Sequence, residues 1–171
     1  EPLLNPEYPK IINEKHFNRL KGLLLEQDGE IITGGRMDAD TLKIEPTLLA
    51  GLTGRSKVMQ EEIFGPVLPV FAYSDLAEVI RILQKKEKPL ALYLFTRNSR
   101  VKKTVISKVS FGGGCINDTI IHLSNEKLPF GGAGNSGMGV YHGKHSYETF
   151  SREKSIMEKG NWLDIPFRYP P

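Results

Sequence analysis

Glu62 and Phe64 stand two residues apart, directly before Gly65, Pro66 and an apolar run. In an extended backbone, side chains at this spacing point to the same face. A carboxylate can accept hydrogen bonds from two neighbouring hydroxyls, and an aromatic ring offers a flat face to a heterocycle. The pair therefore suits a nucleoside, whereas the alternative is an exposed glutamate beside a core phenylalanine.

The two residues that follow the pair restrict what this segment can become. Gly65 lets a second strand or a ligand approach the backbone closely, and Pro66 fixes φ and removes a hydrogen-bond donor. The segment therefore cannot slide into a central position of a sheet. We expect a rigid stretch over residues 62–66, called the ledge below, that carries one acid and one ring.

Cys115 is the only cysteine, so the chain has no internal disulfide framework and a reducing compartment is expected. Because His122 and His142 follow it, Cys115 could act as a thiol nucleophile in a small hydrolase. The alternative is a buried, inert thiol, which we favour. The four histidines do not have metal-ligand spacing, so we expect no metal site.

A glycine motif at residues 132–137 matches G-x-G-x-x-G, and Glu158 follows about 20 residues later, as a dinucleotide-binding fingerprint would require. That fingerprint needs a strand before it and a helix after it. Residues 138–143 contain too much glycine to propagate a helix. We therefore interpret the motif as a turn scaffold.

Composition limits the class of protein. The chain has 171 residues and a formal charge of +3, with acids and bases spread along it, which argues against a nucleic-acid arm or a membrane-surface helix. It has no apolar run of transmembrane length, so a cytoplasmic protein is expected. It begins with Glu1 rather than Met, as if it were cut from a longer polypeptide.

The elements that must position these residues follow from hydrophobic periodicity. Asn13 is a plausible N-cap for an amphipathic helix that buries Phe17, Leu20 and Leu24. Residues 30–33 are typical of a short strand, and Pro46 splits residues 42–52 into two extended pieces. Alternating strands and helices then predict a parallel sheet, over residues 68–73, 76–86, 90–96, 99–108 and 111–117. A structured loop covers residues 119–143, and residues 149–156 end the regular part as a strand.

Several motifs together carry a resemblance to a known family. They are Glu-Glu-Ile-Phe-Gly-Pro-Val at residues 61–67, Glu-Lys-Pro-Leu-Ala-Leu-Tyr at 87–93, Gly112-Gly113 with Asn117-Asp118, Leu-Pro-Phe-Gly-Gly at 128–132, Gly-Asn-Ser-Gly-Met-Gly at 134–139, Tyr-His-Gly-Lys at 141–144, and Arg-Tyr-Pro-Pro at 168–171. This set resembles the class 3 branch of the aldehyde dehydrogenases. The resemblance is dense from Pro46 to the last residue and loose over residues 1–45.

The resemblance implies an α/β fold with a parallel twisted sheet, flanking helices and a Rossmann-like architecture. Residues 1–148 would be part of the catalytic domain, without its nucleophile segment, and residues 149–171 would form a C-terminal oligomerisation strand and tail. The implied partners are an aldehyde substrate, the N-terminal dinucleotide-binding portion of the same protein and a second copy in a homodimer. It implies neither a nucleic-acid partner nor a membrane segment in this chain.

The resemblance also implies roles for individual residues. Glu62 would accept hydrogen bonds from the nicotinamide ribose, and Phe64 would pack beside the nicotinamide ring of NAD or NADP. The substrate tunnel would contain Phe130, with Ser124, Tyr141 and His142 in the same loop. The family's nucleophile and general base lie upstream of the matched segments, so we expect no catalytic residue in this chain and no activity from the chain alone.

Further expectations refine this hypothesis. Asn117 and Asp118 should anchor a strand end through backbone hydrogen bonds, and the family strand favours an inert Cys115. Phe111 and Gly114 depart from the family pattern and could reshape the pocket floor. An apolar tunnel suits aromatic or medium to long aliphatic aldehydes, while the choice between NAD and NADP stays open. The alternative function is a non-enzymatic dimerisation module of the same fold.

Overall fold

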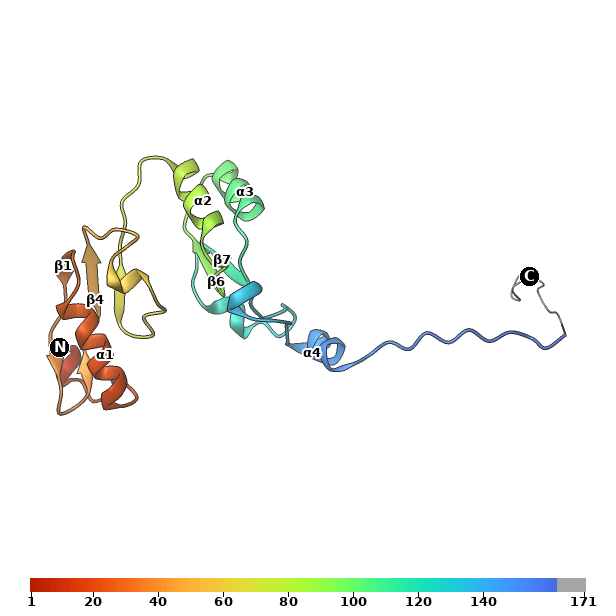
Figure 1. Cartoon of the computed structure of the whole chain (residues 1–171), viewed down its shortest axis with the longest axis horizontal. Helices are drawn as coiled ribbons and strands as arrows, with labels where there is room; N and C mark the ends of the chain where they lie inside the picture. Colours follow the sequence, from red (N-terminus) through yellow and green to blue (C-terminus); the bar gives the residue numbers. More distant parts are fainter. Residues whose placement is uncertain (163–171) are drawn as a thin grey trace, which may run out of the picture. The chain divides into compact units, whose positions relative to one another are not determined.

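The computed structural model describes residues 1–162. The described residues divide into two units, the first over residues 1–74 and the second from residue 75 onward, and each is described by itself (Figure 1). Both are mixed α/β units built on small sheets. The division at residue 148 between a catalytic-domain part and a C-terminal tail is a different boundary from the one between these units, and it stays a prediction.

The first unit contains one long helix and a three-stranded sheet. Helix α1 (Glu14–Leu25) is followed by β1 (Glu30–Thr33), and β4 (Thr47–Ala50) lies between β1 and β5 (Val67–Pro69) in the sheet. The β1–β4 pair is antiparallel and the β4–β5 pair is parallel. The remaining elements are short: η1 (Pro2–Leu4), β2 (Met37–Asp38), β3 (Lys43–Ile44) and η2 (Lys57–Met59).

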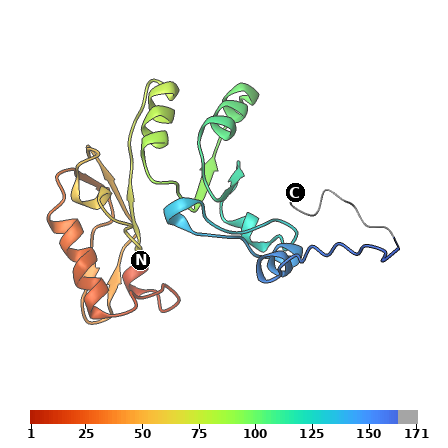
Figure 2. The same cartoon turned by 45° about the vertical axis from the view of Figure 1, so that its right-hand side comes forward.

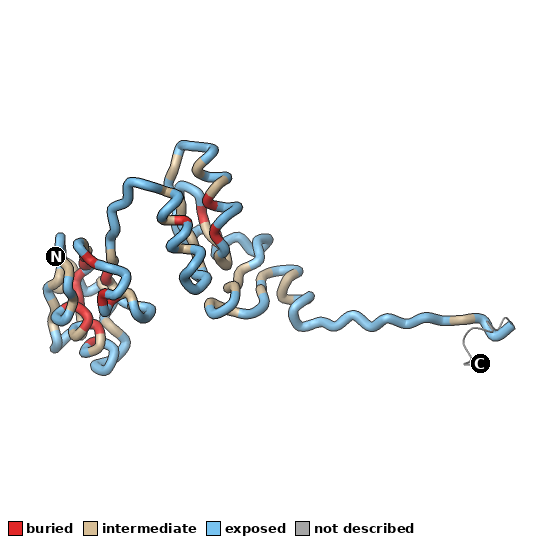
Figure 3. The backbone as a smooth tube through the Cα atoms, turned by 45° about the horizontal axis from the view of Figure 1, so that its top comes forward, coloured by how far each residue is buried: buried red, intermediate tan, exposed pale blue. Residues whose placement is uncertain are grey.

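Helix α1 begins and packs as its sequence predicts. The side chain of Asn13 caps it by accepting a hydrogen bond from the backbone N–H of His16 at 3.0 Å. Phe17, Leu20 and Leu24 are buried on its inner face, and they form the core of this unit with residues from the strands and η2, which appear red in Figure 3. The predicted helix, the strand at residues 30–33 and the two pieces around Pro46 are confirmed.

The second unit is built around a parallel strand pair with a helical crossover. Its elements are α2 (Leu76–Lys85), β6 (Ala91–Leu94), α3 (Ser99–Lys108), β7 (Gly113–Ile116), η3 (Ile121–Ser124), η4 (Gly134–Ser136) and α4 (Gly143–Phe150). Strands β6 and β7 pair in parallel, and α2 and α3 lie side by side in Figures 1 and 2. Ile80, Val105 and Val109 form the core between helices and strands.

Side-chain caps begin the two helices that precede β6 and β7. Asp75 caps α2 by accepting a hydrogen bond from the N–H of Ala77 at 2.8 Å. The cap of α3 is Asn98, whose side chain accepts from Arg100 and Val101. Ser99 is the first helical residue. An amide oxygen reaches the free N–H groups of the first turn as well as a hydroxyl does.

The strand expected over residues 68–73 is wrong in extent and burial. Only Val67–Pro69 is a strand, and it pairs with β4 of the first unit rather than with β6. Leu68, Phe71 and Tyr73 are exposed. Pro66 and Pro69 have no N–H, so this segment cannot donate the hydrogen bonds of a central strand. Among residues 1–162, the expected continuous parallel sheet is therefore replaced by three small sheets.

The strand expected over residues 149–156 is not formed in the structure. Thr149 and Phe150 belong to α4, and residues 151–160 are in neither a helix nor a strand. The Thr149 hydroxyl donates to the carbonyl of Val140 at 2.6 Å, which ties this residue to the preceding loop. An oligomerisation strand needs a partner edge to satisfy its backbone groups, so that role stays a prediction. Residues 163–171, including the Arg168–Pro171 motif, lie outside the described residues.

Candidate functional site

The ledge lies between η2 and β5, and both of its predicted functional side chains are exposed. Glu62 makes no hydrogen bond or ion pair within the described part of the chain. Phe64 is 83% exposed, which excludes the alternative of a core phenylalanine. An acceptor and a flat ring are thus both available to a ligand.

The backbone of the ledge is not extended, so the spacing argument that placed Glu62 and Phe64 on one face does not apply. Phe64 has φ +49°, in the left-handed region that bulky residues rarely adopt. The expected rigidity of the ledge rests instead on its contact with helix α1. A Cβ on Gly65 would lie 2.6 Å from Leu20 of α1, so the absent side chain lets the ledge rest directly against this helix.

A cavity of about 490 Å³ lies beside Phe64 and is lined also by Lys10, Ile11, Ile12 and His16. The sequence did not single out Lys10, Ile11 or Ile12 as site residues, because nothing local links a coil before α1 to a turn some fifty residues later. The residues present fit a nicotinamide nucleoside: a partner-free carboxylate accepts hydroxyl hydrogen bonds, and an exposed ring beside an apolar hollow accommodates a heterocycle.

A second candidate region is an aromatic cluster in the loop of the second unit. Phe130 and Tyr141 form an isolated β-bridge with hydrogen bonds of 3.0 and 2.9 Å between their backbones. The ring of Phe130 meets Tyr141 edge-on at 5.5 Å and stacks with His142 at 5.9 Å between centroids. Three of the four predicted substrate residues are therefore brought together.

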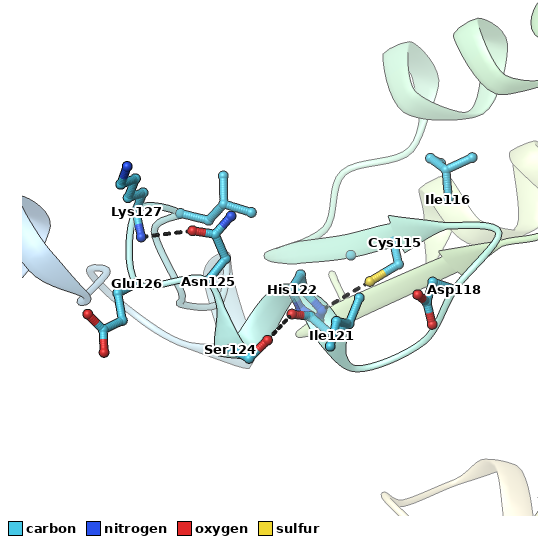
Figure 4. Close-up of a pocket in the computed structure, with 11 residues that line it drawn as sticks. Cys115, Ile116, Asp118, Ile121, His122, Ser124, Asn125, Glu126 and Lys127 are labelled. Carbon is cyan, nitrogen blue, oxygen red and sulfur yellow. Dashed lines mark hydrogen bonds between the residues drawn. The ribbon is translucent and has the colours of Figure 1, made fainter.

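Ser124, the fourth predicted substrate residue, lies apart from that cluster. It lines a cavity of about 830 Å³ that is also lined by Cys115 and His122 (Figure 4). Its hydroxyl donates to the carbonyl of Ile121 at 2.8 Å. This hydrogen bond closes η3.

Cys115 is buried, as predicted, at 9% exposure, and its Sγ lies 3.5 Å from Nδ1 of His122. The contact joins β7 to η3, as Figure 4 shows. The ring of His122 also packs against Tyr93 and Phe130. Nε2 of His122 and Nδ1 of His142 are buried without a hydrogen-bond partner in the described residues. Both of these rings contact Phe130.

Asn117 anchors the end of β7, as expected. Its side-chain oxygen accepts from the N–H of Thr96 at 2.7 Å, and its amide nitrogen donates to the carbonyl of Thr96 at 3.1 Å. Asp118 bonds only locally, to the N–H of Thr119. The interpretation of the glycine motif as a turn is confirmed, because η4 is a single 3-10 turn and the next helix begins at Gly143.

The chain belongs to the aldehyde dehydrogenase family, whose family model matches residues 6–156. It is 50% identical over 167 residues to 4,4'-diaponeurosporen-aldehyde dehydrogenase of Staphylococcus aureus, and the alignment covers 98% of this chain and 36% of that protein. It is 47% identical to the dimeric NADP-preferring aldehyde dehydrogenase of Rattus norvegicus, covering 96% and 36%.

A solved structure gives the same result for the fold. The substrate-bound state of Staphylococcus aureus AldH superimposes with a TM-score of 0.89 at 49% identity, covering 99% of this chain and 37% of that one. The chain thus spans about a third of the length of the relatives it matches. The chain's membership of the family, close to the class 3 enzymes, is therefore confirmed. The activity of the whole enzyme stays a proposal.

Proposed function

We propose that this chain is part of an NAD- or NADP-dependent aldehyde dehydrogenase that oxidises aromatic or medium to long aliphatic aldehydes to carboxylic acids in the cytoplasm. Within that enzyme it supplies the nicotinamide-ribose contact and part of the substrate tunnel. The observation that carries the proposal is the ledge, where Glu62 is exposed and unpaired within the described residues and the 83% exposed Phe64 lines a cavity of about 490 Å³.

The ledge acts by binding and orienting. When bound, the dinucleotide accepts the hydride that the aldehyde loses. Glu62 holds the ribose through its two carboxylate oxygens, and Phe64 limits the positions that the ring can take. Orientation of this kind lowers the barrier by fixing the reacting atoms before the reaction begins. The nucleophilic thiolate and the water-activating base come from the N-terminal portion, so this chain alone is inactive.

The aromatic cluster of Phe130, Tyr141 and His142 forms one wall of the aldehyde tunnel. The β-bridge between Phe130 and Tyr141 fixes the backbone that carries the rings. An apolar lining of this kind suits an aldehyde with an aromatic or aliphatic side chain. Ser124 borders a neighbouring hollow and has a lesser role.

Replacing Glu62 by Gln tests the proposal. Each hydrogen bond to a charged acceptor contributes about 1.5–3 kcal/mol, so loss of the charge should weaken dinucleotide binding about tenfold or more in the intact enzyme. The matched control is Glu30→Gln, at an exposed position on β1, which should leave binding unchanged. Calorimetric titration of NAD⁺ and NADP⁺ provides the readout, together with steady-state kinetics. Unchanged cofactor constants in Glu62→Gln would refute the proposal.

The alternative function, a dimerisation module, concerns the tail. Several apolar residues there are exposed, among them Ile156, Met157 and Trp162, and burial of such residues stabilises protein association. Light scattering of the chain before and after deletion of residues 149–171 separates the two functions. A dimer that is lost on deletion supports a homodimer through the tail, and a monomer in both cases excludes a self-association module.

A further inference from the structure

We infer that Arg19 on α1 is a positioning residue that holds the ledge in its binding conformation. The inference rests on the proposed function of Glu62 and Phe64. It arises from contacts that the sequence does not suggest, because Arg19 is 42 residues from its ion-pair partner Glu61 and 44 residues from Ile63.

The guanidinium of Arg19 bonds to both sides of Glu62. Its Nη1 donates to Oε1 of Glu61 at 2.7 Å, and its Nη2 donates to the carbonyl oxygen of Ile63 at 2.5 Å. Arginine is suited to this task because its fork of donors is planar and its charge is permanent. The Arg19 side chain is only 27% exposed, so these bonds are partly shielded from water.

The carbonyl that Arg19 holds belongs to the peptide unit that leads into Phe64, and Phe64 is the strained residue of the ledge with φ +49°. A left-handed conformation for a residue with a bulky side chain persists only where surrounding contacts determine it. The hydrogen bond to the Ile63 carbonyl fixes the orientation of this peptide plane. The backbone bond from Val67 N–H to the Gly65 carbonyl, at 2.8 Å, closes the turn on its other side.

Helix α1 gives Arg19 a firm base. The neighbouring residue, Leu20, is fully buried and lies against Gly65, where any Cβ would come within 2.6 Å. Arg19 and Leu20 thus hold the ledge at two points, one polar and one steric. Because α1 is itself capped and packed on the core, the ledge inherits the rigidity of a buried helix.

Without Arg19, the peptide plane between Ile63 and Phe64 should be free to rotate. Phe64 should then adopt an ordinary negative φ. Phe64 and Glu62 would then leave the positions in which one supports the nicotinamide and the other accepts its ribose hydroxyls. The tunnel residues belong to the other unit, whereas the partners of Arg19, Glu61 and Ile63, belong to the ledge region of the first unit. We therefore expect dinucleotide binding to weaken while the KM for aldehyde is retained.

The test compares Arg19→Ala, Arg19→Lys and Glu61→Gln in the intact enzyme. The dissociation constants of NAD⁺ and NADP⁺ are measured by calorimetric titration, the KM for aldehyde by steady-state kinetics and the unfolding midpoint by heating. Arg19→Ala should weaken dinucleotide binding about tenfold, as expected for loss of a charge-assisted hydrogen bond. Arg19→Lys should recover part of this loss, since one ammonium can reach only one of the two acceptors at full strength. Glu61→Gln should change binding less than about threefold, because the Glu61 side chain is half-exposed.

The outcomes separate this inference from the proposed function. If Glu62→Gln weakens dinucleotide binding but Arg19→Ala does not, the positioning role is wrong and the ledge holds itself. If neither variant affects binding, the proposed function fails as well. If Arg19→Ala lowers the unfolding midpoint and alters the KM for aldehyde and the dinucleotide affinity alike, Arg19 is a general structural residue, and the inference is also overturned.

Discussion

Glu45 is a buried acid with a single strong partner. It is 6% exposed and accepts two hydrogen bonds from the guanidinium of Arg36, at 3.0 and 2.7 Å. The hydrogen bonds from the Arg36 side chain hold the pKa of Glu45 below its ordinary value of 4.5. Asp38 behaves in the same way, since the Thr41 hydroxyl lowers its pKa.

This arrangement predicts how the first unit responds to acid. A depressed pKa in the folded state contributes stability that is fully present above the ordinary pKa and is lost as pH falls through the folded pKa. The urea midpoint of the chain should therefore be steady above pH 4.5 and fall below it. In Glu45→Gln the midpoint should be lower at neutral pH, and its fall in acid should be smaller. An acid dependence as steep as that of the parent would show that Glu45 contributes nothing.

At the residue scale, the sequence predicted side chains that act through local motifs and missed those that act across the fold. Glu62 and Phe64 are exposed as a binding pair requires, and Asn117 anchors a strand end. Nothing in the sequence indicated a role for Arg19, because its proposed role depends on a contact between a helix and a distant turn. The positive φ of Phe64 cannot be read from residue types, and the sequence could not decide between His122 and His142 as the neighbour of Cys115.

At the element scale, the close approach of β6 and β7 depends on Gly114, which the sequence marked as a departure from the family pattern. A Cβ at this position would lie 1.9 Å from the carbonyl oxygen of Leu92 on the paired strand. The absence of a side chain therefore permits the observed strand pairing, and a backbone atom cannot move aside as a flexible side chain could.

Gly114→Ala should accordingly destabilise the second unit by about 1–3 kcal/mol, the usual cost of overpacking. Gly54→Ala is the matched control, because no atom lies within 4 Å of a Cβ there. Urea titration followed by circular dichroism measures both variants. Equal midpoints for Gly114→Ala and the parent chain would contradict the close approach.

Elements with strong local signals were predicted well, and elements that depend on distant partners were not. The helices α1, α2 and α3 follow from periodicity and capping residues, within one or two residues at their ends. The strand at Val67–Pro69 was assigned to the wrong sheet, because an apolar run indicates a strand but does not specify its neighbour. Similarly, residues 149–150 carry a β-prone pattern yet extend α4.

At the scale of the whole molecule, apolar surface is the feature that the sequence could not locate. Ile31 and Ile32 on β1 and Leu68 on β5 are exposed, and these two strands are the outer ones of their sheet. Edge strands with exposed apolar side chains favour association with further strands or with a covering layer. Such surface agrees with the proposal that this chain functions as one portion of a larger enzyme. No helix within residues 1–162 is long and apolar enough to cross a membrane.

The segment from Val70 to Asp75 has a practical consequence for anyone who handles this protein. All its side chains are exposed, two of them are aromatic, and the boundary between the two packed units falls after Ser74. Brief digestion with chymotrypsin should nick the chain after Phe71 or Tyr73, and after the exposed Phe150 where α4 ends, before it cuts within the other helices and strands. Intact-mass spectrometry of the early products would reveal a matching pair of pieces, each a candidate for separate crystallisation or NMR work. Early cuts spread throughout both halves would mean that neither piece keeps its structure.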